Sequence, residues 1–284
     1  MKFSYLLFCS FFFLAFQTTK PIKSNKPPKG YAFIPAGIVD VGGEKQAISP
    51  FLMPETEVTN EQYRRFLADL KSEGKDSLFR LAYPDTAAWK IKDWQMEPMA
   101  KMYFWHPAYD RYPVVNVSKM GADLYCKWLE NQLKESYGNQ IKSVRLPHSV
   151  EWTYAAKAGD DRAVYPWGGS YLMNSKGCYL ANFSVVGDQN IRKTENGLEV
   201  VTDSTFIPDM SILDHSLLTA IAKSYQPNEF NLYNMSGNVA ELTAENLAMG
   251  GHWNSTGYDI RITSEIPFEK PNPFVGFRPI IELK

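Results

Sequence analysis

The segment with the clearest potential for chemistry is NLYNMSGNVAEL, which covers residues 231–242. Asn234, Gly237, Val239 and Glu241 follow one another at steps of three, two and two residues. A curled loop with this spacing could direct one amide oxygen, two backbone carbonyls and one carboxylate to a common point, and these are hard oxygen donors of the kind that Ca²⁺ takes. The alternative is an Asn-x-x-Gly turn in which Asn234 bonds its own backbone and Glu241 begins a solvated segment. The spacing alone leaves both interpretations open.

Residues suited to other reactions are few and widely separated. An imidazole iron site needs several converging rings, but the four histidines lie in different motifs and none has a ligand spacing such as i and i+4: His106, His148, His215 and His252. The chain also lacks a Gly-x-Ser-x-Gly elbow, a phosphate-binding Gly-x-x-x-x-Gly-Lys and a His-Glu-x-x-His pair. Acyl transfer, nucleotide chemistry and zinc hydrolysis therefore have no motif to support them.

The composition is that of a soluble globular protein without a strong electrostatic preference. Hydrophobic residues make up 44% and charged residues 21% of the 284 residues, which is ordinary for such a chain. The 30 basic and 31 acidic residues give a formal net charge of -1, so the charge balance does not favour a nucleic-acid partner. Beyond Cys9, the chain has only Cys126 and Cys178, which allow one disulfide at most.

The N-terminus has the layout of an export signal. Lys2 precedes an apolar run from Phe3 to Phe16, and this run is shorter than the ~20 residues that a membrane-spanning helix needs. The pattern predicts a cleaved signal peptide over residues 1–17, no stable transmembrane span, and a periplasmic, outer-membrane-associated or extracellular location. Cys9 lies inside the run, so we interpret it as incidental rather than as a lipid-attachment site.

The elements that must position the loop at 231–242 can be read from the rest of the chain. Residues 18–30 are rich in Lys and Pro and predict an extended tether, followed by a single domain over residues 31–284. Alternating apolar residues and a Gly-Gly turn predict a first strand within residues 31–43. Caps and helical spacing predict three helices. The first lies within residues 57–70 and starts after Thr59 or Asn60, the second lies within residues 116–138 between Ser118 and Gly138, and the third lies within residues 148–159. With 14% aromatic residues and 18 each of Gly and Pro, we expect an α+β domain with few helices, short strands and long packed loops.

Four stretches, in this order, resemble one family. They are MPETEVTNEQYRRF, YPVVNVSKMGADLYCKWL, VRLPHSVEWTYAAKAGDDRAVYPWGG, and NEFNLYNMSGNVAEL with the later MGGHW and VGFRPI. Together they are similar to the sulfatase-modifying-factor, or formylglycine-generating-enzyme, domain, whose fold is of the C-type-lectin type, and they cover nearly all of residues 31–284. The insert at residues 83–115 is similar to a subgroup found in Bacteroidetes gliding-motility and type IX secretion lipoproteins, which implies a structural rather than an enzymatic role.

The resemblance implies two calcium sites. The first would use the residues already identified in the loop at 231–242. The second would use the Asn182 side chain, the Phe183 carbonyl, the Asp214 carboxylate and a carbonyl near Ser216. Because the intervening stretch is longer than usual, Asp209 is a rival to Asp214.

The catalytic residues that the resemblance would require are missing. Enzymes of the family bind copper(I) through two cysteines between their Gly-Gly-Ser-Trp-like and Gly-Phe-Arg motifs, because that ion prefers soft thiolate ligands. The corresponding residues 250–278 contain no cysteine, so copper is not expected. We therefore expect a non-catalytic, calcium-stabilised scaffold that binds a protein or glycan partner in the cell envelope, with gliding motility or type IX secretion as the process that the insert suggests. Two alternatives are an oxidoreductase of the formylglycine-generating or non-haem iron superfamily with a non-standard site, and a lectin-like protein that displays residues 254–274 to a ligand.

Overall fold

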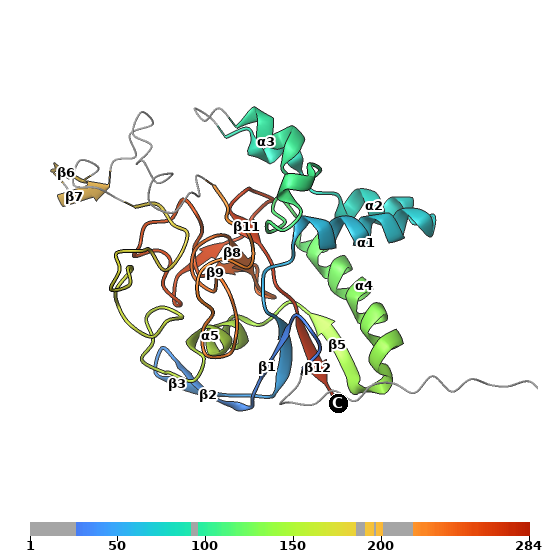
Figure 1. Ribbon diagram of the computed structural model, residues 1–284, viewed down its shortest axis with the longest axis horizontal. Helices are drawn as coiled ribbons and strands as arrows, with labels where there is room; N and C mark the ends of the chain where they lie inside the picture. Colours follow the sequence, from blue (N-terminus) through green and yellow to red (C-terminus); the bar gives the residue numbers. More distant parts are fainter. Residues whose placement is uncertain (1–26, 92–95, 186–190, 196, 201–217) are drawn as a thin grey trace, which may run out of the picture.

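A four-stranded antiparallel sheet joins segments from distant parts of the chain. The computed structural model describes residues 27–91, 96–185, 191–195, 197–200 and 218–284. The strands are β1 (Tyr31–Ile34), β4 (Phe51–Pro54), β5 (Ile141–Arg145) and β12 (Ile280–Leu283), and their order in the sheet is β1-β4-β12-β5. The last strand in sequence therefore lies between two earlier ones, at the lower edge of the view in Figure 1.

A second four-stranded sheet carries part of the loop that was predicted to bind calcium. Its order is β10 (Glu265–Pro267), β9 (Leu247–Met249), β8 (Ala240–Leu242) and β11 (Val275–Gly276), with β11 parallel to β8. Two hairpins complete the strands, β2 (Gly37–Val41) with β3 (Glu44–Ile48), and β6 (Ile191–Thr194) with β7 (Gly197–Val200). The single strand predicted within residues 31–43 is in fact two strands, β1 and β2, separated at Pro35, which has no N–H group to donate to a ladder.

The three predicted helices are present. α1 (Asn60–Ser72) is capped by Thr59, which forms a capping box with Gln62. α4 (Lys119–Tyr137) is capped by Ser118 at its start and by Gly138 at its end, and α5 is Ser149–Lys157. The shorter elements were not predicted: α2 (Asp76–Ala82), α3 (Glu97–Met102), and the 3-10 turns η1 (Thr86–Trp89), η2 (Pro107–Tyr109) and η3 (Gly138–Gln140). α1, α2 and α4 lie together on one side of the molecule (Figure 1).

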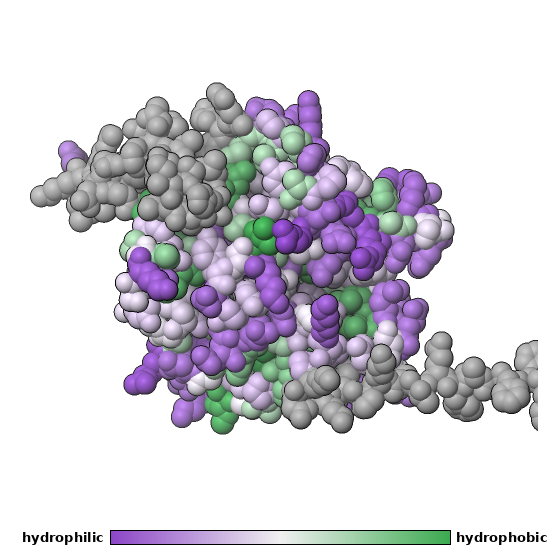
Figure 2. Space-filling model, in the orientation of Figure 1, coloured by the Kyte–Doolittle hydropathy of each residue, from purple (hydrophilic) through white to green (hydrophobic). Residues whose placement is uncertain are grey.

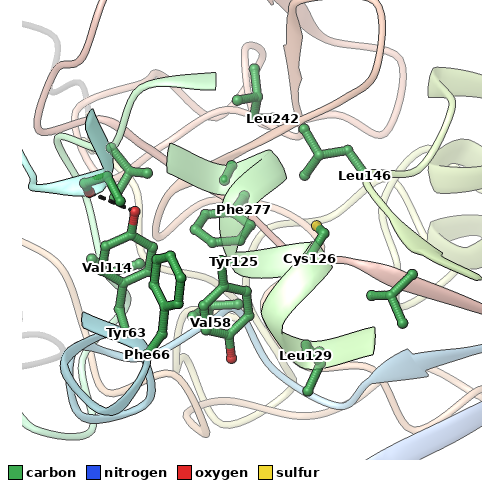
Figure 3. Close-up of a cluster of buried hydrophobic side chains, with 14 of the residues drawn as sticks. Val58, Tyr63, Phe66, Val114, Tyr125, Cys126, Leu129, Leu146, Leu242 and Phe277 are labelled. Carbon is green, nitrogen blue, oxygen red and sulfur yellow. Dashed lines mark hydrogen bonds between the residues drawn. The ribbon is translucent and has the colours of Figure 1, made fainter. Parts of the chain in front are cut away.

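An aromatic core fixes these helices to the C-terminal part of the chain (Figure 3). The rings of Tyr63 and Tyr125 are stacked with centroids 5.7 Å apart, and Phe277 meets Tyr125 edge-on at 5.4 Å. The Tyr63 hydroxyl donates to the Ala82 carbonyl at 2.7 Å. Because Phe277 is a member of this core, its neighbour Arg278 is held at a fixed position.

Both cysteines of the described chain are free thiols. Cys126 is buried in the aromatic core and Cys178 is exposed, so the disulfide that the sequence left open does not form. Burial raises the pKa of the Cys126 thiol far above its ordinary value, and a thiol held neutral in this way is inert packing.

The surface shown in Figure 2 is mostly hydrophilic, with small separate hydrophobic patches. Within the described parts of the chain, no helix has both the length and the apolar character needed to cross a bilayer. The predicted signal peptide at residues 1–17, Cys9 and most of the tether lie outside the described residues.

Candidate functional site

The loop at residues 231–241 is curled by a run of left-handed backbone conformations. The φ angles of Asn231, Asn234, Gly237 and Asn238 are 63°, 53°, 73° and 60°, values that glycine and asparagine tolerate best. A Cβ atom at Gly237 would lie 2.3 Å from the carbonyl oxygen of Asn182. The Asn/Gly spacing of the sequence therefore produces the predicted curl, and the curled loop packs closely against the Asn182 carbonyl at Gly237.

The two asparagine side chains of this loop point inward to Glu57. Asn238 donates from Nδ2 to Glu57 Oε1 at 2.7 Å, and Asn234 donates from Nδ2 to both Glu57 oxygens at 3.2 and 3.3 Å. Asn234 also donates to the carbonyl of Ala222 at 3.0 Å. The interpretation in which the Asn234 side chain bonds its own backbone is therefore wrong, because its amide donates to Glu57 and Ala222.

Glu241 is buried and fully hydrogen-bonded. It is 1% exposed, so it does not begin a solvated segment. Its carboxylate accepts from Trp152 Nε1 at 2.8 Å, from Arg278 Nη2 at 2.6 Å, and from Arg278 Nε at 3.1 Å on each oxygen. These donors occupy the lone-pair directions that a carboxylate offers.

Arg278 ties four segments together as a hydrogen-bonding hub. Besides Glu241, it donates to the carbonyls of Pro54 at 3.1 Å, Glu55 at 2.8 Å and Tyr233 at 2.7 Å. It is 0% exposed. All five N–H groups of a guanidinium can be satisfied only where acceptors are fixed in this way.

The buried network holds two carboxyl groups but only one guanidinium. Glu57 and Glu241 are 0% and 1% exposed and share one guanidinium, with Arg278 Nη2 4.0 Å from Glu57 Oε2. Burial raises the pKa of the Glu57 carboxyl to about 8, with Arg278 opposing and the Glu241 charge adding to the rise. Two ionised carboxylates and one guanidinium would leave a net charge of one negative unit, which a proton or a bound cation would neutralise.

The loop satisfies only part of the donor set that Ca²⁺ would need. Asn234 uses its amide nitrogen for Glu57 and Ala222, which directs its amide oxygen away from them. The Ser236 hydroxyl is buried and has no hydrogen-bond partner among the described residues. These oxygens and the carbonyls of Gly237 and Val239 fit a hard cation. Glu241 fits it only if Arg278 or Trp152 releases a carboxylate oxygen.

Asn182, a predicted ligand of the second calcium site, lies against the curled loop. The Asn182 carbonyl accepts from Asn238 N at 2.8 Å, and Asn182 Nδ2 donates to Asn238 Oδ1 at 3.3 Å and to the Leu218 carbonyl at 2.7 Å. The Phe183 side chain is buried in a separate apolar cluster. Asp214, Ser216 and the rival Asp209 lie outside the described residues. Within the described chain, no three His, Cys, Asp or Glu side chains are grouped so as to hold a metal ion.

The segment where the family cysteines would lie contains no activated nucleophile. Ser255 is 7% exposed, and its Oγ accepts from the backbone N–H of His252 at 3.1 Å. The His252 ring lies 4.5 Å from the Phe274 ring, and its Nδ1 accepts from Asn254 N at 3.2 Å. Burial lowers the pKa of His252 to about 4, so the ring is neutral near pH 7. Because Nδ1 bonds Asn254 rather than the Ser255 hydroxyl, these contacts do not form a base–nucleophile pair.

The insert covers this segment and the curled loop. Trp89, Tyr103 and Val115 from the insert region form one buried cluster with Val239 and Trp253. Among the aromatic residues of the insert, Tyr103 and Phe104 are core residues at 1% and 4% exposure, whereas Trp105 is 49% exposed. Tyr109 is partly buried and packs against the insert cluster.

Glu57, Asn238 and Trp152 belong to the site but could not be assigned to it from the sequence. All three lie inside the stretches that carry the family resemblance, which was the available signal. Their roles depend on contacts across long sequence separations, such as 181 residues between Glu57 and Asn238.

Comparison with known proteins identifies the family. The model of the sulfatase-modifying factor enzyme 1-like domain matches residues 16–283, so the chain belongs to this family. The inactive C-alpha-formylglycine-generating enzyme 2 of Bos taurus is 26% identical over 216 residues, which are 69% of this chain and 60% of that protein. The formylglycine-generating enzyme of Thermomonospora curvata is 26% identical over 256 residues, with coverage of 76% and 71%. The match thus spans about three-fifths of the bovine relative.

Two solved structures share the fold. The crystal structure of CarF has a TM-score of 0.56 at 20% identity, covering 93% of this chain and 99% of that chain. The structure of PvdO from Pseudomonas aeruginosa has a TM-score of 0.55 at 17% identity, covering 89% and 94%. The expected α+β architecture with few helices and short strands is therefore confirmed.

Proposed function

We propose that this member of the sulfatase-modifying factor family is a non-catalytic domain that serves as a binding scaffold. The observation that carries the proposal is the span of residues 250–278, which has no cysteine and holds Ser255 and His252 in buried structural contacts. The names of two relatives, the inactive C-alpha-formylglycine-generating enzymes 2 of Bos taurus and Mus musculus, support it.

The decisive test is an assay for formylglycine formation. The purified chain is incubated with a Cys-x-Pro-x-Arg peptide, copper(I) and oxygen, beside the Thermomonospora curvata enzyme as a positive control. We expect the control to convert the peptide and this chain to leave it unchanged by mass spectrometry. Conversion by this chain would refute the proposal, and a redox-active metal at one equivalent per chain would favour an oxidoreductase instead.

The scaffold is proposed to act in the cell envelope after export. The export-signal pattern at residues 1–17 and the insert at 83–115 support this location and a role in gliding motility or type IX secretion. Trp105, exposed on the insert, offers a contact that can be removed without opening the core. Crosslinking in the native envelope, with Trp105→Ala beside the unmodified chain, should capture a protein partner that the variant captures less. An unchanged capture would place the partner elsewhere.

The curled loop is proposed to hold Ca²⁺ through Asn234 and the carbonyls of Gly237 and Val239, with Glu241 as the predicted fourth ligand. Two facts support this proposal: two buried carboxyl groups share the Arg278 guanidinium, and the buried Ser236 hydroxyl has no hydrogen-bond partner among the described residues. A ligand that binds only the folded state stabilises it by about 2.7 kcal/mol at a hundredfold excess over Kd. The thermal midpoint should therefore rise with Ca²⁺, fall with chelator and lose this response in Asn234→Ala. If Arg278 alone balances Glu241, millimolar Ca²⁺ will leave the midpoint unchanged.

A further inference from the structure

Residues 218–222, which we call the strap, lie against the curled loop and are held there by asparagine side chains. Asn182 Nδ2 donates to the Leu218 carbonyl at 2.7 Å at one end of the strap. Asn234 Nδ2 donates to the Ala222 carbonyl at 3.0 Å at the other end. Both bonds come from the NH2 group of a carboxamide, so each end of the strap is fixed through a backbone acceptor.

The middle of the strap is held by both ends of one carboxamide. Asn238 accepts through Oδ1 from Ala220 N at 2.7 Å, and its Nδ2 lies 3.5 Å from the Ala220 carbonyl. The carbonyls of alternate strap residues thus face the asparagines, as alternate carbonyls of an extended chain do. We call Asn182, Asn234 and Asn238 the asparagine clamp.

The strap is also bonded to the insert at residues 83–115. The hydroxyls of Thr219 and Tyr103 are 2.9 Å apart, and Ala222 N donates to the Arg111 carbonyl at 2.9 Å. Thr219 and Ala222 are 5% and 1% exposed. The strap therefore connects the curled loop with the segment that carries the proposed partner contact.

Glu57 sets the orientation of two amides of the clamp. Its Oε1 accepts from Asn238 Nδ2 at 2.7 Å and from Asn234 Nδ2 at 3.2 Å. A carboxamide has one donor end and one acceptor end, so an acceptor at this position selects the NH2 end of both asparagines. The amide oxygen of Asn234 is thereby directed away from Glu57 and from the strap. One side chain thus offers its donor end to the strap and its acceptor end to the proposed cation.

We infer that Ca²⁺ bound at the curled loop fastens the strap, with Asn234 as the residue that joins the two. This inference rests on the proposed calcium site and adds a regulatory role to it. When its oxygen binds a cation, the Asn234 amide keeps one orientation and its N–H groups become stronger donors to the Ala222 carbonyl. Coupling between two sites is reciprocal, so a fastened strap also raises the affinity for Ca²⁺.

The first test is amide hydrogen exchange of the purified full chain, beside calorimetry with CaCl2. The N–H groups of Ala220 and Ala222 report local opening of the strap, and amides of α4 are the reference for the whole fold. Coupling between sites is typically ~5–150-fold. Exchange of the two strap amides should therefore be at least ~fivefold slower in saturating Ca²⁺ than in chelator, and α4 should change less.

Two variants test the reverse direction. Asn238→Gly removes the middle of the clamp at a position whose φ of 60° glycine tolerates, and Ala220→Pro removes the N–H that Asn238 accepts without changing the curled loop. Each should weaken Ca²⁺ binding at least ~fivefold, and either one suffices if the other does not fold. Asn231→Gly is the matched control, because its φ is 63° and its side chain bonds Glu55 rather than the strap. It should leave both the affinity and the exchange of Ala222 unchanged.

The outcomes separate this inference from the proposals on which it rests. Calcium binding that leaves the strap amides unchanged, or that slows α4 equally, would overturn the inference and leave the calcium site standing. An unchanged affinity in the folded strap and clamp variants would overturn it as well. The absence of any calorimetric response to Ca²⁺ would refute both the calcium site and the inference. The non-catalytic scaffold would survive each of these results, because the formylglycine assay decides it.

Discussion

The buried pair of Arg278 and Glu241 makes the strongest prediction for the stability of the fold. Arg278 donates six hydrogen bonds, three to Glu241 and three to the carbonyls of Pro54, Glu55 and Tyr233. Removing one partner of a buried ion pair leaves the other charge uncompensated and costs ~3–5 kcal/mol. We therefore expect Arg278→Met to lower the free energy of unfolding by about 4 kcal/mol, a large share of the ~5–15 kcal/mol of a typical domain.

The assay is urea unfolding followed by fluorescence, with midpoints compared at a constant m-value. Glu241→Gln alone should also be destabilising, and the double variant should lose ~2 kcal/mol less than the sum of the single losses, because both substitutions break one network. Arg278→Lys keeps the positive charge but not the planar set of guanidinium donors, so it should still be destabilising. It replaces Arg278→Met in the assay if that variant does not fold. The control is the exposed pair of Lys119 and Asp123, where alanine should cost less than ~1 kcal/mol. A loss below ~1 kcal/mol for Arg278→Met, or strict additivity, would refute the reasoning.

Three further predictions concern single groups of the site. Burial raises the folded-state pKa of Glu57 from 4.5 to about 8. The contribution of Glu57 to stability is therefore present below pH 4.5 and is lost as the pH rises through 8. Glu57→Gln should flatten this decline in the thermal midpoint. Burial lowers the pKa of His252 from 6.5 to about 4, so stability should fall as the pH drops from 6.5 towards 4. His252→Phe should remove this dependence of stability on pH, and an unchanged dependence would contradict the burial argument. Gly237→Ala should lower the free energy of unfolding by at least ~1 kcal/mol in urea, because Gly237 has a positive φ and a Cβ atom would meet Asn182. Gly43→Ala, at a position with a positive φ but open space around it, should lower it by less.

The helices could be predicted because their signals are local. Thr59 and Ser118 cap helices whose apolar faces follow at helical spacing, and Gly138 ends the second of them. The short helices α2 and α3 could not be predicted in the same way. Each spans only seven or six residues and has no side-chain cap, so its place depends on tertiary packing rather than on a local pattern.

The candidate site was predictable in its loop geometry but not in its partners. Asn and Gly at the observed spacing produce the left-handed turns around Gly237. Which group balances Glu241 depends on Arg278, 37 residues later, and on Trp152, 89 residues earlier. Sequence spacing cannot supply contacts at that separation, so the network that joins Glu241 to Glu57 emerged only from the fold.

The position of β12 in the first sheet has a consequence for how the protein is made. β12 pairs with both β4 and β5, so neither of these strands can complete its pairing until residues 280–283 have left the ribosome. Until then their unpaired edges keep the nascent chain open, and the late, long-range pairing makes closure slow. For a chain that is proposed to be exported, this order of events keeps the first sheet open until β12 has been made.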